Sequence, residues 1–480
     1  MKLPLAAALL AAVAVSLDPG GQLENFERRT LDARARHHAA PTPHTERIVI
    51  LDITEESIER LRPLYGRWPW PRSLHGEVAE YLAADGAAAI GFDLLFAEPV
   101  TRRELDAEDW QALAALAPNA DLAEVRAELA RRIDALQPGL GDSQFAAAVA
   151  RAGNVFQAAV FAPAEKAAGG AMRDQAVLPF EALARASRGI GHINVLPDAD
   201  GGYRRFFPLL RAGDGEASRP ALGLAIAAHV KGLPLASLRR EAAGLAFGDG
   251  VLPLQADDSA WIHYQGGVLR RQADGSEAFE SFYRHIPYED VLASKDLRAA
   301  GQASPLAPGA FRDKIVLVSA RAAGLSDLRA TPFSPVTPGI EIHAHIIDSL
   351  LAGRHLRAPG AAAGFLLTLA VCLAAAALAW KPRFRLGVPL VLAAAGAFGA
   401  SVWAAYGTGW VLPLVPPAVA MALACGGVLL ARAAMAERDK RWLRTAFGHY
   451  LAPSVLEEVL RTPGRLRLGG ERRHMTVLFS

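Results

Sequence analysis

The stretch that decides the organisation of this chain is AAAGFLLTLAVCLAAAALAW, from Ala361 to Trp380. It carries no charged residue and has about the 20 residues that a helix needs to cross a ~30 Å hydrocarbon core. Two further apolar runs follow, from Leu386 to about Tyr406 and from Trp410 to Ala431. Uncharged runs of this length are typical of membrane-spanning helices rather than of buried core helices. The sequence therefore predicts three transmembrane helices within residues 361–431.

Prolines and basic residues refine this prediction. Pro413, Pro416 and Pro417 lie in the third run, and we expect them to kink its helix near one end, which bundles tolerate.

The loop between the first two runs is basic, KPRFR at 381–385, whereas the loop between the second and third has no charge. The tail carries Arg432, Arg438, Lys440, Arg441 and Arg444. Because basic loops stay in the cytoplasm, the C-terminus is predicted to be cytoplasmic and the region before Ala361 to lie outside.

A shorter apolar stretch, Leu3 to Leu17, follows Lys2. Its roughly 15 residues reach only about 22 Å at ~1.5 Å each, which is short for a span. Residues 1–20 therefore fit a signal peptide with a cleavage site near Ala12-Val-Ala14, or an uncleaved anchor. The single positive charge before the stretch favours the anchor. Both alternatives export the region that follows.

Composition agrees with a soluble part joined to a lipid-embedded part. Of the 480 residues, 52% are hydrophobic and 21% are charged, and the net charge is +2. No polybasic tract or basic–aromatic stripe is present, so a nucleic acid partner is not expected. The two cysteines, Cys372 and Cys425, both fall in the apolar runs. The polar region therefore has neither a disulfide nor a cysteine-ligated zinc site.

The polar region, residues 25–355, has a mixed α/β pattern. Apolar and β-branched runs predict strands at 47–53, 87–96, 154–161 and 313–320, and helical spacing predicts helices at 73–84, 220–230 and 340–351. Turn signals predict a hairpin at 245–254 and paired strands at 191–195 and 203–210 around a turn at Asp198. Residues 102–136 are predicted to be a solvated helical insertion. The predicted fold class is an α/β exported domain, with a mixed, largely parallel sheet and flanking helices, followed by an all-α transmembrane helix cluster.

Asp52 and Asp93 each follow a predicted strand. Parallel sheets bind ligands outside the carboxyl ends of their strands, so both carboxylates are candidate ligand-binding residues. The alternative is that each caps a helix or holds a loop, and the absence of a partnered base or phosphate loop favours this alternative. No serine-hydrolase elbow, P-loop or dinucleotide fingerprint is present.

Two further groups of residues have open interpretations. Trp68-Pro-Trp70-Pro-Arg72 restricts the backbone and presents two indoles and a guanidinium. Trp68, Trp70 and Arg72 either line a ligand pocket or seal the sheet edge before the next helix.

Glu341 and His345 share a helix face at i and i+4, with His343 between them. A third metal ligand is not evident, so helix packing is favoured and no metal site is expected.

The polar region resembles the second class of CHASE sensor domain, an extracellular module of bacterial membrane receptors. The matching blocks are 48–53 (IVILDI), 68–72 (WPWPR), 91–96 (GFDLLF), 314–318 (KIVLV), and Thr331-Pro332 with 338–344 (PGIEIHA). That family typically has one anchor before the sensor and three helices after it. The resemblance implies an extracytoplasmic ligand, a homodimer, and a multi-pass protein in the lipid bilayer of the bacterial inner membrane.

The tail resembles the entry to class III adenylate/guanylate cyclases. The matching residues are 447–453 (FGHYLAP), 468–471 (LGGE) and 475–480 (MTVLFS). In that family the next residue is the first metal-binding aspartate, and two Mg or Mn ions assist cyclisation. We therefore expect residues 471–480 to begin a cyclase domain whose catalytic and metal-binding residues lie downstream, so that this chain holds no catalytic residue and no cofactor.

Residues 432–470 are predicted to link membrane and catalyst, because 437–450 has the charged, partly amphipathic pattern of a signalling helix. The function expected is that of the sensor and transmembrane portion of a receptor-type cyclase, with cyclic AMP as the expected product. Two alternatives remain open. One is a sensor of the same class coupled to a histidine or Ser/Thr kinase, and the other is a non-catalytic membrane binding protein.

Overall fold

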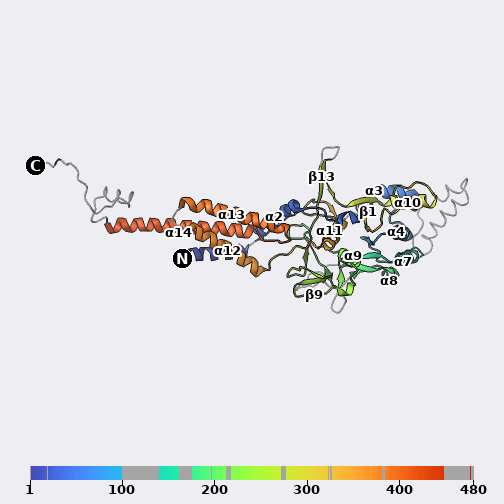
Figure 1. Cartoon of the computed structure of the whole chain (residues 1–480), viewed down its shortest axis with the longest axis horizontal. Coiled ribbons are helices and arrows are strands. Elements are labelled where there is room, and N and C mark those ends of the chain that lie inside the picture. The colour runs from blue at the N-terminus through green and yellow to red at the C-terminus, as the bar shows by residue number, and fades with distance from the viewer. Residues whose placement is uncertain are drawn as a thin grey trace. The chain divides into compact units, whose positions relative to one another are not determined.

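The structure is a computed structural model. It describes residues 2–18, 20–99, 140–161, 176–195, 197–211, 218–271, 277–322, 324, 327–380, 384–447 and 476. The predicted insertion at 102–136 and the cyclase-like residues 468–480, apart from Thr476, lie outside the described residues. The chain divides into two units, which are described separately (Figure 1). The first unit is Met1–Glu27, Ala361–Val402 and Pro413–Ser480, and the second is Arg28–Gly360 and Trp403–Leu412. They are called the membrane unit and the sensor unit, after the expectations from the sequence.

A seven-stranded sheet forms the centre of the sensor unit. The strands run in the order β15-β1-β16-β2-β3-β4, and β5 also pairs with β3. All pairs are parallel except β3 with β4. The strands are β1 (Ile48–Ile53), β2 (Ala89–Phe92), β3 (Val155–Phe161), β4 (Ala176–Val177), β5 (Gly189–His192), β15 (Arg284–Pro287) and β16 (Ile315–Ala320). The largely parallel α/β sheet predicted from the sequence is confirmed.

Helices cover both faces of this sheet (Figure 1). One face carries α3 (Glu55–Tyr65), α4 (Arg72–Ala84), α7 (Leu140–Ala152), α8 (Glu181–Ala186) and α10 (Tyr288–Ala299), and the other carries α9 (Leu222–Val230) and α11 (Gly339–Ala352). Side-chain alternation in β1 explains the two cores, because successive residues point to opposite faces. Ile48 and Ile50 pack with α9 and α11, whereas Val49, Leu51 and Ile53 pack with the other helices.

Smaller sheets surround this centre. They are formed by β6 (Arg205–Phe206) with β12 (Ala260–Trp261), β7 (Leu209–Leu210) with β8 (Arg219–Pro220), β9 (Arg240–Glu241) with β10 (Gly244–Phe247) and β11 (Gly250–Leu252), β13 (Gly267–Arg271) with β14 (Glu277–Ser281), and β17 (Leu328–Arg329) with β18 (Thr337–Pro338). Two 3-10 turns, η1 (Thr45–Arg47) and η2 (Leu235–Ser237), and the part of α2 (Gln22–His38) from Arg28 onward also belong to this unit. The hairpin predicted at 245–254 is confirmed as β10 and β11.

The strand pairing predicted between 191–195 and 203–210 is wrong. The turn itself is present, since the amide of Asp198 donates to the carbonyl of Gly202 at 2.8 Å. However, β5 pairs in parallel with β3 and β6 pairs with β12, which leaves a single antiparallel bridge between Val195 and Phe206. Tertiary pairing with the central sheet has overridden the local turn signal.

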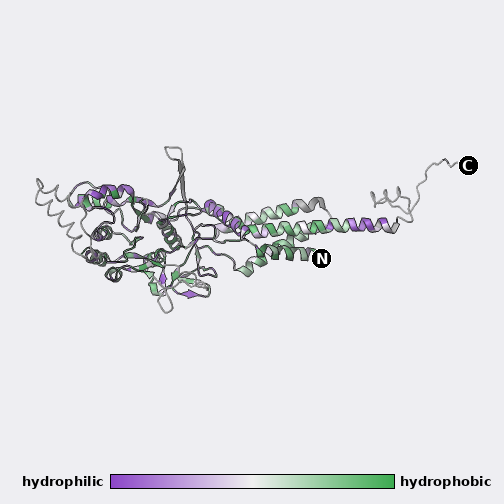
Figure 2. Ribbon diagram, turned by 180° about the vertical axis from the view of Figure 1, so that it is seen from behind, coloured by the Kyte–Doolittle hydropathy of each residue, from purple (hydrophilic) through white to green (hydrophobic). Residues whose placement is uncertain are grey.

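The membrane unit consists of apolar helices. They are α1 (Lys2–Leu17), α12 (Ala361–Trp380), α13 (Phe384–Gly407) and α14 (Val415–Phe447). Three segments are long and apolar enough to cross a membrane, namely Ala361–Trp380, Pro389–Gly407 and Val415–Trp442. The bent pair of α1 with α2 (Gln22–His38) passes the same test only when the two helices are taken together. Figure 2 shows the apolar colour along α12–α14 and a hydrophilic C-terminal part of α14.

Small side chains hold α1, α12 and α14 together. Ala8, Ala11, Cys372, Ala376 and Ala424 are all buried in one cluster. Apolar side chains gain little by leaving lipid for protein, so close packing of small residues is the main attraction between such helices. The described part of the membrane unit therefore has the packing of a helix bundle.

The third apolar helix begins later than expected. The predicted run started at Trp410, but α14 starts at Val415, and Trp410 instead forms a bridge with Arg357. Pro416 and Pro417 consequently lie in the first turn of α14, where backbone amides have no helical acceptor. The predicted kink is wrong, because these prolines start the helix rather than bend it.

Candidate functional site

The carboxyl edge of the central sheet collects polar side chains on the face covered by α11. Asp52 lies near the end of β1 and has the same side-chain direction as Ile48 and Ile50. Only 4% of its surface is exposed. Asp93 follows β2 directly, and its amide donates to the carbonyl of Val318 at 2.8 Å. The structure therefore places both predicted carboxylates at one edge of the sheet, where parallel sheets bind ligands.

Asp52 is the centre of a charged network. Its Oδ2 lies 2.7 Å from His285 Nδ1 and accepts a hydrogen bond from Arg321 Nη1 at 3.0 Å. The short contact identifies Nδ1 as the protonated nitrogen that donates to the carboxylate. The other ring nitrogen, Nε2, lies 3.3 Å from the hydroxyl of Ser281. Asp52 does not cap α3, because Thr54 does so by accepting from the amide of Ser57.

Glu341 brings a second carboxylate to the same imidazole. It lies in the first turn of α11, and its Oε1 is 3.7 Å from His285 Nε2. Burial raises the pKa of the Glu341 carboxyl. Among the described residues, neither Asp52 Oδ1 nor Glu341 Oε2 has a hydrogen-bond partner, although both atoms are buried. Unpartnered buried oxygens cost free energy, so this edge is suited to a ligand that donates hydrogen bonds.

Asp93 adds a titratable group beside this network. Burial raises its pKa to about 8, with a further contribution from Asp327 and an opposing one from Arg329. A carboxyl with this pKa is mostly protonated at neutral pH and donates a hydrogen bond. The edge therefore combines acceptors at Asp52 and Glu341 with a donor at Asp93.

The Trp68–Arg72 segment lies in the opposite layer. Trp70 is 3% exposed, stacks on Tyr288 with ring centroids 5.4 Å apart, and meets Trp68 edge to face at 5.0 Å. Arg72 donates to Asp142 Oδ1 at 2.7 Å and to the carbonyl of Glu98 at 2.6 Å. These contacts tie α4 to α7 and to the chain after β2. The structure does not bring this segment together with Asp52 and Asp93, and its part in ligand binding stays a prediction.

The other polar residues of α11 are buried in the core. His345 Nδ1 lies 2.9 Å from the hydroxyl of Tyr283, and Asp348 accepts from the hydroxyls of Thr42 and, at 2.6 Å, Thr45. Burial lowers the pKa of His343 to about 4 and that of His345 to about 3, so both are neutral at pH 7. Within the described ranges, no group of three or more His, Cys, Asp or Glu residues could hold a metal ion.

Sequence reasoning missed the basic partners of the network. Arg321 follows β16 directly, so the rule that singled out Asp52 and Asp93 also applies to it. His285 lies in β15, a strand that the pattern did not predict. Ser281 lies at the site only through the tertiary fold, and no local signal marks it. The sequence singled out Glu341 only for its helix face shared with His345, and the tertiary fold places it beside His285 instead.

The fold and the site define a class of protein: an α/β domain with buried polar groups at the carboxyl edge of its sheet, in a chain that also has apolar helices of membrane-spanning length. The model of the CHASE2 domain matches residues 6–378, so this chain belongs to the CHASE2 family. CHASE2 is an extracellular sensor domain of signalling proteins. No curated protein and no solved structure matches the chain.

Proposed function

We propose that this chain is the sensor and transmembrane portion of a receptor that controls cyclic nucleotide synthesis, with cyclic AMP as the product. The observation that carries the proposal is the family match over residues 6–378 together with the helix that follows it. α14 runs without a break from Val415 to Phe447, so the last apolar span and the predicted signalling helix are one element. A continuous helix can pass a rotation or shift from the sensor side to the C-terminal side.

The proposed topology puts the sensor outside the bacterial inner membrane and the C-terminus in the cytoplasm. The basic residues at 381–385 and after Ala431, and the uncharged loop at 407–409, support this orientation. The membrane-embedded protein would act as a homodimer, because class III cyclase sites form between two catalytic domains. In this proposal, the carboxylates that hold two Mg or Mn ions belong to a cyclase domain encoded after Ser480.

The proposed signal is a small ligand bound at the carboxyl edge of the sheet. Asp52 and Glu341 present unpartnered oxygens there, on β1 and on the first turn of α11. α11 is also the helix that leads toward α12, the first apolar span. A ligand that binds between β1 and α11 would act directly on the element that continues toward the membrane.

Two experiments test the proposal. The coding sequence after codon 480 should continue with an aspartate and a complete cyclase domain; a kinase domain would instead support the alternative receptor, and a natural stop codon a non-catalytic binding protein. The full gene product, expressed in a cyclase-null bacterium, should then produce cyclic AMP. Absence of any cyclic nucleotide, despite normal abundance in the membrane, would overturn the proposal.

A further inference from the structure

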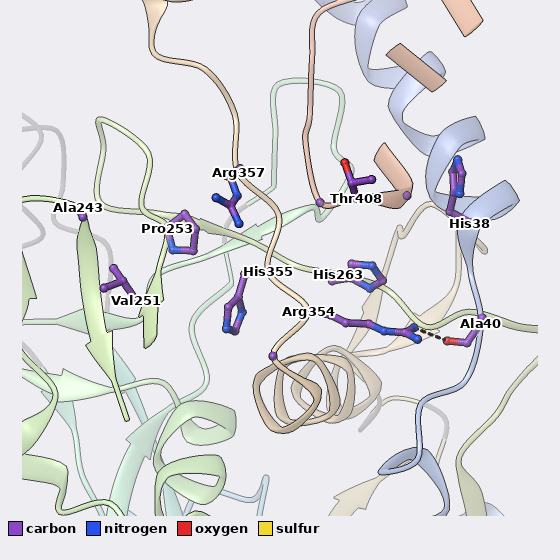
Figure 3. Close-up of a pocket in the computed structure, with 13 residues that line it drawn as sticks. His38, Ala40, Ala243, Val251, Pro253, His263, Arg354, His355, Arg357 and Thr408 are labelled. Carbon is purple, nitrogen blue, oxygen red and sulfur yellow. Dashed lines mark hydrogen bonds between the residues drawn. The ribbon is translucent and has the colours of Figure 1, made fainter. Parts of the chain in front are cut away.

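A pocket of the sensor unit lies where three segments of the chain meet. It has a volume of about 560 Å³. His38 is the last residue of α2, Arg354, His355 and Arg357 lie between α11 and α12, and the loop from Gly407 to Gly409 follows α13 (Figure 3). These are the segments through which the sensor unit continues into its apolar helices. The pocket is separate from the Asp52 edge, with which it shares no lining residue.

The backbone fixes this meeting point. The amide of Arg357 donates to the carbonyl of Gly409 at 2.8 Å, and the amide of Val411 donates to the carbonyl of Arg357 at 2.9 Å. A Cβ on Gly409, whose φ is +88°, would lie 2.7 Å from the carbonyl oxygen of His355. Only glycine permits this approach without displacing the backbone. The loop between the second and third apolar helices is therefore held against the segment that precedes the first.

The charged side chains in the described lining of the pocket, Arg354 and Arg357, are both positive. Arg354, Arg357, His38, His263 and His355 line it, and its described lining contains no Asp or Glu. Among the described residues, neither arginine takes part in an ion pair. The guanidinium of Arg357 lies 5.2 Å from the ring centroid of Trp410, and that of Arg354 reaches only a backbone carbonyl, that of Ala40, at 3.4 Å.

Two histidines of the lining are neutral at pH 7, chiefly because they are buried. Burial, with a smaller contribution from Arg354, lowers the pKa of His263 to about 4. Burial also lowers the pKa of His355 to about 4, with added contributions from Lys231 and Arg357. The buried Nδ1 of His263 has no hydrogen-bond partner in the described structure. The pocket thus offers two guanidinium groups and a free imidazole without a compensating anion.

We propose that this pocket binds a phosphate group, with Arg354 and Arg357 as the charged contacts and His263 as a neutral hydrogen-bond partner. Guanidinium groups bind phosphate oxygens in a bidentate manner, and hydrogen bonds between two charged groups are stronger than neutral ones. The apolar side chains of Val251 and Pro253 form another part of the lining, so the phosphate can carry an apolar or esterified substituent. Free phosphate and the headgroup of an anionic phospholipid share this chemistry.

The experiment uses the full chain in nanodiscs and measures binding directly, so it is independent of the proposed cyclase function. One arm titrates inorganic phosphate into chain held in phosphatidylcholine nanodiscs, at constant ionic strength, by calorimetry. The other arm measures retention of phosphatidylglycerol by native mass spectrometry. Saturable binding in the first arm identifies free phosphate as the ligand source, and binding in the second arm alone identifies the lipid headgroup.

Variants decide whether the pocket is responsible. Arg354→Gln and Arg357→Gln should each weaken binding about tenfold, while Arg357→Lys should retain part of it, since charge remains but the bidentate contact is lost. Arg354 is exposed, so its replacement leaves the fold intact. The matched control is Arg185→Gln on α8, whose side chain is 76% exposed and lies outside the pocket. Absence of saturable binding in both arms, or equal binding by all variants, would overturn the proposal.

Discussion

The two faces of the central sheet are built from different side chains. The face covered by α3, α4, α7 and α10 is closed by aromatic rings, with Trp70, Phe92, Phe145 and Tyr288 all buried. The face covered by α9 and α11 also buries aromatic rings, such as Phe206 and Tyr264, but it adds a group of polar residues: Asp52 of β1 and Glu341, His343, His345 and Asp348 of α11. Buried apolar rings stabilise a fold, whereas buried polar groups cost free energy unless they are partnered. The comparison teaches that apolar packing stabilises both faces, and that the face covered by α11 additionally gathers polar groups able to respond to a ligand.

The largest expected effect concerns the aromatic face. Replacing Trp70 by alanine removes an indole that stacks on Tyr288, and we expect a loss of about 3–5 kcal/mol of unfolding free energy. Chemical denaturation of the detergent-solubilised chain, followed by circular dichroism, measures it. Trp68→Ala is the matched control and should cost less, because Trp68 is only half-buried. A loss below about 1 kcal/mol for Trp70→Ala would contradict the stabilising role assigned to this aromatic packing.

The second-largest expected effect concerns Asp348, a buried carboxylate of α11 that has hydrogen-bond partners. Asp348 accepts from the hydroxyls of Thr42, Thr45 and Tyr283, so Asp348→Ala leaves the buried hydroxyls of Thr42 and Thr45 without their acceptor, whereas Tyr283 keeps its contact with His345 Nδ1. We expect a loss of about 3 kcal/mol in the same denaturation measurement. Glu181→Ala, which changes an exposed carboxylate on α8, should be nearly neutral. A neutral Asp348→Ala would contradict the importance assigned to these hydrogen bonds.

Acid should destabilise both faces through their histidines. The pKa of His75 is lowered to about 3 and that of His343 to about 4, in both cases chiefly by burial, from 6.5 in the unfolded chain. Between pH 6.5 and the lowered pKa values, the unfolded state binds more protons than the folded state. The stability that the neutral buried histidines contribute is therefore fully present above pH 6.5 and is lost as the pH falls toward the lowered values. Melting temperature against pH measures the effect. The melting temperature of His343→Leu should fall less steeply at acid pH than that of the wild-type chain. An identical fall would contradict a neutral buried His343.

Asp93 should show the opposite pH dependence. Its pKa of about 8 in the folded chain lies above the ordinary 3.8, so the folded state binds more protons between these values. Stability should therefore fall as the pH rises through this window and level off above about pH 8. Asp93→Asn, which cannot ionise, should melt higher than the wild-type chain at pH 8 but not at pH 4. Equal differences at both values would show that Asp93 is ionised throughout.

Local pattern predicted most of the sheet but only half of the polar edge. The β-branched runs at β1 and β16 are buried on both sides, and such runs are typical of parallel strands. Asp52 and Asp93 were found because strand ends are recognisable in sequence. His285 was missed because β15 is a short strand that pairs with β1 across more than 200 residues, and only the tertiary fold brings them together. The strand pairing predicted around the Asp198 turn failed for the same reason, since its flanking strands pair elsewhere apart from one bridge.

The most direct test of the account is the cyclic AMP output of the full gene product in a cyclase-null bacterium, compared among the wild-type chain, Asp52→Asn and Arg185→Gln. Asp52→Asn removes the charge that holds His285 and Arg321, but it keeps the shape of the side chain. At equal abundance in the membrane, the account predicts cyclic AMP in the wild type, a change of about fivefold or more with Asp52→Asn, and no change with Arg185→Gln. Identical output from all three chains would contradict a signalling role for the polar face, and absence of cyclic nucleotide in every case would contradict the receptor cyclase itself.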